Sequence, residues 1–154
     1  MIQRVQSLYL LAVTVLLVLA MLLPIGYYTH VGEPLSDVLR PLGITMADGS
    51  HETTWGLFAI LMVSAVVSLG TIFLFRNRML QVRMTIFSSI LLIGYYVSVG
   101  VFIFTMKSNS GAEAFRPGLA LALPLVCIIL NYLAFRAIYS DEIMVRAADR
   151  LRRR

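Results

Sequence analysis

Arginine is the residue type with the clearest capacity for chemistry in this sequence, because it gathers in two short segments. These are the stretch FRNRMLQVR and the C-terminal tail, residues 140–154. The guanidinium group stays charged and presents several donors in a fixed geometry that suits phosphate and carboxylate groups. We therefore interpret seven residues as candidates for binding a lipid or a protein partner: Arg76, Arg78, Arg83, Arg146, Arg150, Arg152 and Arg153.

A second set of polar residues lies inside long apolar stretches: Thr14, Ser64, Ser68, Tyr95, Tyr96 and Asn131. A helix rises about 1.5 Å per residue, which puts Tyr95 roughly 18 Å beyond Arg83 and near the centre of a membrane. Two interpretations remain open, namely close packing of helices through small and hydroxyl residues and a polar pocket for a small molecule or lipid. In both cases we expect Ser64, Tyr95 and Tyr96 to face inward, because a buried phenol seeks a partner.

The sequence contains no constellation that specifies a reaction, and we expect a non-enzymatic protein without a cofactor or metal. An ionisable residue inside a membrane span is a functional hypothesis by default, but the apolar stretches have none in their interiors. His30 and His51 could meet Glu33, Asp48 or Glu52 as a weak metal site. Two histidines without a recognised ligand spacing are better interpreted as solvated loop residues.

Composition indicates a membrane protein. The 154 residues are 59% hydrophobic and 14% charged, whereas soluble domains are about 45–50% apolar and about 25% charged. A net charge of +5 is a weaker signal, since the distribution of charge along a membrane protein matters more than its sum. We therefore do not expect nucleic acid as a partner. The single cysteine, Cys127, excludes an internal disulfide or a CxxC site.

Four apolar stretches are long enough to cross a bilayer, which takes about 20 residues. They cover residues 8–28, 55–75, 84–106 and 117–139. The predicted fold is an all-α integral membrane four-helix bundle forming a single domain over residues 1–154. The short FRNRMLQVR connection makes the second and third spans an antiparallel hairpin. In the outer loop, residues 29–54, the turn ADGS between ITM and HETTW predicts a small β-hairpin.

The distribution of basic residues predicts the orientation. The N-terminus, residues 76–83, and the end of the fourth span with the tail that follows it hold ten of the thirteen Lys and Arg residues, and the two other loops hold only Arg40, Lys107 and Arg116. Because basic residues concentrate on the inner side of membranes, both termini are expected in the cytoplasm.

The tail is predicted to be an amphipathic cytoplasmic helix. At 100° per residue, one face carries Ile143, Met144, Ala147, Ala148 and Leu151. Glu142 with Arg146, and Asp149 with Arg153, are i,i+4 pairs in the favourable order. Such a helix could lie on the membrane or on a partner, with its arginines near anionic headgroups.

Three segments carry a resemblance: MIQRVQSLYLL, FRNRMLQVR, and NYLAFRAI followed by DEIMVRAADRLR. They resemble a domain-of-unknown-function family of small four-span inner-membrane proteins from Bacteroidota-type bacteria. The resemblance implies a four-helix membrane fold in a bacterial inner membrane, and it supplies no activity or site residue.

Two functions are compatible with these observations. The leading hypothesis is an accessory or scaffold subunit that engages a partner or anionic lipid through its basic cytoplasmic face. The alternative is a carrier of small molecules or lipids that uses the mid-membrane polar layer, with the outer loop as a lid.

Overall fold

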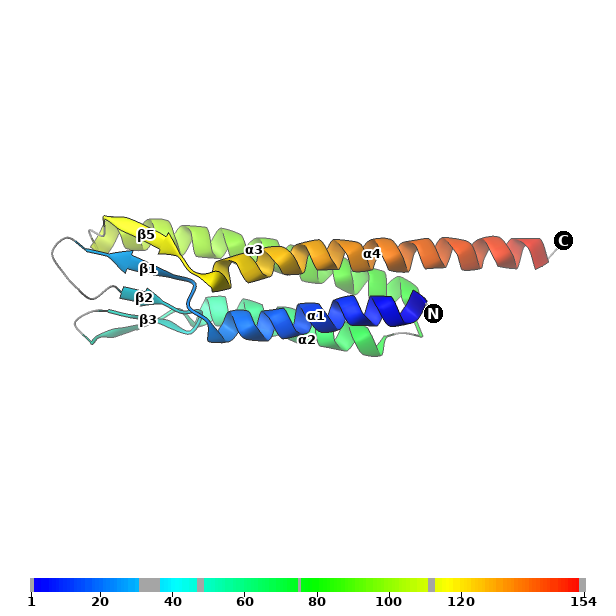
Figure 1. The fold of residues 1–154 in the computed structure, drawn as a ribbon, viewed down its shortest axis with the longest axis horizontal. Helices are drawn as coiled ribbons and strands as arrows, with labels where there is room; N and C mark the ends of the chain where they lie inside the picture. The colour runs from blue at the N-terminus through cyan, green and yellow to red at the C-terminus, as the bar shows by residue number, and fades with distance from the viewer. Residues whose placement is uncertain (1, 31–36, 47–48, 75, 111–112, 153–154) are drawn as a thin grey trace.

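The computed structural model describes residues 2–30, 37–46, 49–74, 76–110 and 113–152, and four long helices dominate it. They are α1 (Ile2–Leu22), α2 (Trp55–Phe73), α3 (Arg78–Ser110) and α4 (Leu119–Arg152). Each is long and apolar enough to cross a membrane. Helices that follow each other in sequence are antiparallel (Figure 1). α1 packs against α2 and α4, and α3 also packs against α2 and α4.

Helix boundaries differ from those of the apolar stretches. α1 ends at Leu22 rather than near residue 28, because the residue before Pro24 is disfavoured in a helix and proline has no N–H to donate. Tyr27 and Tyr28 therefore lie in a strand. α3 is longer than the expected span at both ends, and α4 continues through Pro124 and past Tyr139 without a break.

A five-stranded antiparallel sheet lies at the end of the helices opposite the N-terminus (Figure 1), so an all-α fold with only a small hairpin was an incomplete prediction. The strands are β1 (Gly26–Thr29), β2 (Asp37–Leu39), β3 (Gly43–Thr45), β4 (His51–Thr53) and β5 (Ala114–Pro117), in the order β4-β3-β2-β1-β5.

The hairpin predicted around ADGS is confirmed as β3–β4, with Thr45 opposite His51. Gly49 there has a φ of 85°, a left-handed conformation that glycine adopts without steric cost. The addition that the sequence did not reveal is the pairing of β1 with β5, in which Tyr28 lies opposite Phe115.

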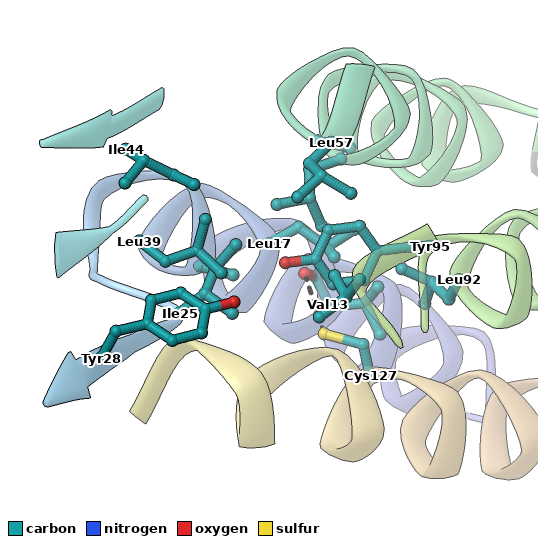
Figure 2. Close-up of a cluster of buried hydrophobic side chains, with 14 residues drawn as sticks. Val13, Leu17, Ile25, Tyr28, Leu39, Ile44, Leu57, Leu92, Tyr95 and Cys127 are labelled. Carbon is teal, nitrogen blue, oxygen red and sulfur yellow. Dashed lines mark hydrogen bonds between the residues drawn. The ribbon is translucent and has the colours of Figure 1, made fainter. Parts of the chain in front are cut away.

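The hydrophobic core runs continuously from the sheet into the helices. Figure 2 shows Tyr28, Leu39 and Ile44 from the strands beside side chains of all four helices, including Tyr95 and Cys127. The outward faces of the helices are apolar as well, with exposed residues such as Leu8, Val66, Ile90 and Phe104. A helix that is apolar on all sides is typical of membrane spans and not of the surface of a soluble protein.

Candidate functional site

The arginines of FRNRMLQVR lie in the connection between α2 and α3 and in the first two turns of α3. The N–H of Asn77 donates to the carbonyl of Leu74 at 3.0 Å, and the N–H of Gln81 donates to the carbonyl of Asn77 at 3.0 Å. α3 begins at Arg78, and the leading N–H groups of any α-helix have no acceptor inside it. The turn therefore places Arg76 and Arg78 beside the positive end of a long helix.

Two ion pairs tie the tail to this turn and to itself. Arg78 Nη1 lies 2.8 Å from Asp141 Oδ2, with both side chains at most one-quarter exposed. Arg146 Nε donates to Glu142 Oε1 at 2.9 Å, as predicted for this i,i+4 pair. The first pair joins the start of α3 to the start of the tail and fixes the level at which the tail leaves the other helices.

A cavity of about 660 Å³ opens between the turn and the tail, and we call it the basic cavity. Its lining consists of Arg76, Asn77, Arg78, Met79, Leu80, Arg83, Glu142 and Val145. Three lining residues are basic and one is acidic, and Arg76 and Arg83 form no ion pair with another described residue. The lining therefore carries a net charge of about +2 by formal count, which suits an anion.

Six of the seven arginines predicted to bind are described by the structure, and these six do not form one site. Arg76, Arg78 and Arg83 line the basic cavity, and Arg146 is next to it through Glu142. Arg150 and Arg152 are exposed farther along α4, and Arg153 lies outside the described residues. The predicted basic face is thus divided into a cavity and a projecting helix.

Three buried residues from three helices form a hydrogen-bonded group that we call the polar seam: Ser68 (α2), Ser88 (α3) and Asn131 (α4). The Ser68 and Ser88 hydroxyl oxygens are 3.2 Å apart, and Asn131 Nδ2 donates to Ser88 Oγ at 3.3 Å. All three side chains are at most 1% exposed. The polar seam joins helices in the way that hydroxyl and amide side chains do inside membranes.

The other residues of the predicted polar layer are not linked to the polar seam by a described hydrogen bond. Thr14 donates to a carbonyl in the preceding turn of α1 at 3.0 Å, and the Tyr96 hydroxyl donates to a backbone carbonyl of α4. Ser64 and Tyr95 are fully buried, and their side-chain oxygens have no hydrogen-bond partner among the described residues. Ser64 and Tyr95 face inward as expected, whereas Tyr96 is only half-buried.

Sequence reasoning missed the polar residues at the start of α3. Gln81, Thr85 and Ser88 are all buried, and Ser88 is the residue to which both other members of the polar seam bond. Their spacing of four and then three residues puts them on one helix face. That periodicity was the available signal.

The histidines of the outer loop do not form a metal site with the described residues. His30 Nε2 lies 2.9 Å from Asp37 Oδ2, and His51 is exposed on β4. Glu33 and Asp48, two of the acidic residues considered as ligands, lie outside the described residues. Within the described part of the chain, no three His, Cys, Asp or Glu residues form a group that could hold a metal ion.

All five strands and nearly all residues of the four helices fall within the match to one family model. A family model described as a domain of unknown function, DUF4293, matches residues 2–151. That range runs from the start of α1 almost to the end of α4. No curated protein matches the chain significantly.

Proposed function

The chain belongs to the DUF4293 family, a domain of unknown function, and we propose that it is a multi-pass membrane protein that acts as an accessory or scaffold subunit rather than as an enzyme. In this proposal the protein resides in a bacterial inner membrane with both termini in the cytoplasm. Its basic cytoplasmic end engages the membrane lipid and a partner protein. The family match agrees with the uncharacterised family that the sequence motifs indicated.

The observation that carries the proposal is the projection of α4 beyond the other helices (Figure 1). α4 has 34 residues, which corresponds to roughly 51 Å at the usual rise, whereas a bilayer core is about 30 Å thick. The pair between Arg78 and Asp141 lies at the start of α3, so the residues after Asp141 extend past the helix ends. A projection of this kind is well suited to contact another molecule.

The tail exposes a face that water solvates poorly. Ile143, Met144 and Leu151 are each more than half exposed, and complete burial of such a side chain contributes about 1.5–3 kcal/mol. Because the tail continues the line of α4, it leads away from a membrane that α4 crosses. Its apolar face therefore favours a partner protein over the lipid surface.

The proposed orientation is supported by charge. The arginines of the α2–α3 turn and of the tail lie at the end of the helices where α1 starts, and basic residues concentrate on the cytoplasmic side of membranes. A cysteine placed at Ser50 or at Ser140 tests this orientation in intact spheroplasts. An impermeant thiol reagent should label S50C and not S140C, and the reverse pattern contradicts the orientation.

The experiment on the tail is capture of a partner from gently solubilised membranes by the full-length protein. The double variant M144Q/L151Q changes the apolar face, and V145Q changes an exposed apolar residue that lies off this face and lines the basic cavity. We expect M144Q/L151Q to lose the captured protein and V145Q to keep it. A chain truncated after Glu142, which retains the Arg78–Asp141 pair, should insert normally and lose the same protein. Equal capture by all variants contradicts the proposal.

A carrier is the second candidate, favoured by three buried polar atoms that have no described partner: Ser64 Oγ, Tyr95 OH and Asn131 Oδ1. A bound ligand would satisfy them. The cavities do not add support for a carrier. Neither the basic cavity nor a second cavity of about 320 Å³ along β3 and β4 is lined by these three residues. A small molecule or lipid that co-purifies with the wild type but not with Tyr95→Phe would favour the carrier over the scaffold.

A further inference from the structure

The basic cavity contains positive charge that no described acidic residue compensates. Arg78 is held by Asp141 at 2.8 Å, which positions its guanidinium, while Arg76 and Arg83 are exposed and form no ion pair with another described residue. The acidic lining residue Glu142 accepts from Arg146 outside the lining, so its charge is largely compensated. An anion in the cavity can therefore bind Arg76 and Arg83 without breaking an ion pair with another described residue.

The backbone adds to this charge. The first three residues of α3, 78–80, belong to the lining. The free N–H groups of a helix N-terminus and the helix dipole together favour a phosphate or carboxylate group. The arginine side chains and the helix end thus act on the same volume.

An apolar stripe on α3 begins at the cavity. Arg83 is followed on the same side of the helix by Phe87, Ile90, Val97 and Val101, each at least 47% exposed. Residues 84–106 contain no charge and extend over roughly 34 Å at the usual helical rise. If α3 crosses the membrane, Arg83 is therefore at the level of the headgroups and the stripe faces the acyl chains.

We propose that the basic cavity binds the phosphate headgroup of an anionic phospholipid of the inner leaflet, with an acyl chain along the stripe of Phe87, Ile90 and Val97. A free phosphate ion would use the arginines but not the stripe, so the observations favour the lipid. The inference rests on the membrane placement proposed above, and it is independent of the protein partner of the tail.

The test uses full-length protein in a neutral detergent and native mass spectrometry. Phosphatidylglycerol and phosphatidylcholine with identical acyl chains are added separately. We expect the wild type to retain phosphatidylglycerol roughly thirtyfold better, because Arg76 and Arg83 should each contribute a factor of about five near an anionic lipid. The variant R76Q/R83Q should lose this preference. The matched control R150Q/R152Q, which removes the same charge from the projecting tail, should keep it, and R76Q alone, which leaves α3 unchanged, should fall in between.

Three results overturn the inference. The first is equal phosphatidylglycerol retention by R76Q/R83Q and the wild type, and the second is an equal loss in R150Q/R152Q, which would indicate unspecific charge attraction. The third is displacement of the lipid by excess inorganic phosphate, which would indicate a free-anion site. The partner-capture assay separates this inference from the proposed function. If R150Q/R152Q loses the lipid preference as R76Q/R83Q does, but capture still depends on Met144 and Leu151, only the lipid site is refuted. If R76Q/R83Q alone loses the lipid preference, but capture does not depend on Met144 and Leu151, only the scaffold is refuted.

Discussion

The two ends of the helices differ. At one end the chain forms the five-stranded sheet, and at the other end lie the basic cavity and the projecting end of α4 (Figure 1). In the sheet, Tyr28 is buried against Phe115 with ring centroids 5.0 Å apart, and burial raises the pKa of the Tyr28 hydroxyl. At the basic end, Arg76 and Arg83 are exposed. The contrast suggests that the sheet end stabilises the fold and that the basic end is available for binding.

This comparison makes separable predictions. Substitutions at the sheet end should change the free energy of unfolding and leave binding unaffected in the protein that still folds. Substitutions at the basic end should do the reverse, because exposed charges contribute little to stability. The variants below are ordered from the largest expected loss of stability to the smallest, and the last one is an expected gain.

Gly118→Ala is expected to have the largest effect. The N–H of Gly118 donates to the carbonyl of Ile25 at 2.7 Å, and a Cβ here would lie 2.5 Å from the carbonyl oxygen of Pro24. Since this neighbour is backbone, the connection between β5 and α4 must shift, and we expect a loss of about 1–3 kcal/mol. Thermal unfolding in detergent measures it.

The matched control is Gly70→Ala on α2, where a Cβ would meet nothing within 4 Å. Alanine is about 1 kcal/mol better than glycine inside a helix, so this variant should be no less stable than the wild type. Equal destabilisation by both variants would mean that the sheet end is no more tightly constrained than the middle of a helix.

Sequence reasoning succeeded where a signal is local. The lengths of the apolar stretches predicted four long helices, and the turn chemistry of ADGS predicted the β3–β4 hairpin. It failed for β1 and β5, because Tyr28 and Phe115 pair across 87 residues and neither segment alternates clearly. The basic cavity also escaped prediction, since it depends on the pair between Arg78 and Asp141, which only the packing of α3 against α4 creates.

Ser88→Ala tests the region between the two ends. It removes the hydroxyl that bonds to both Ser68 and Asn131, and hydrogen bonds between helices in membranes contribute about 0.6 kcal/mol on average. We expect a loss of about 1 kcal/mol in the same unfolding assay. Ser89→Ala is the control, because the Ser89 hydroxyl bonds only within its own helix, to the carbonyl of Thr85. If the two variants have the same effect, the polar seam does not join the helices.

Asp141→Asn tests the basic end directly. The lost ion pair is partly exposed, so we expect less than about 1 kcal/mol in the free energy of unfolding. The tail itself should become more mobile, because Asp141 ties it to the start of α3. Protease cleavage after the tail arginines should therefore accelerate relative to Asp149→Asn, a change at an exposed tail residue. A large loss of stability would show instead that the basic end also supports the fold.

Tyr95→Phe is expected to have an effect of the opposite sign to those above. The Tyr95 hydroxyl is fully buried and has no hydrogen-bond partner among the described residues, so its removal takes away a desolvation cost while the ring keeps its edge contact with Tyr96 at 5.9 Å. We expect stability to rise by up to about 1 kcal/mol. Tyr96→Phe should instead lower stability slightly, because the Tyr96 hydroxyl donates to the carbonyl of Leu121. Adjacent tyrosines with opposite responses would indicate a packed interior between the two ends. If Tyr95→Phe is clearly destabilising, its hydroxyl has a partner such as a bound ligand or water, and the carrier becomes the better explanation of the interior.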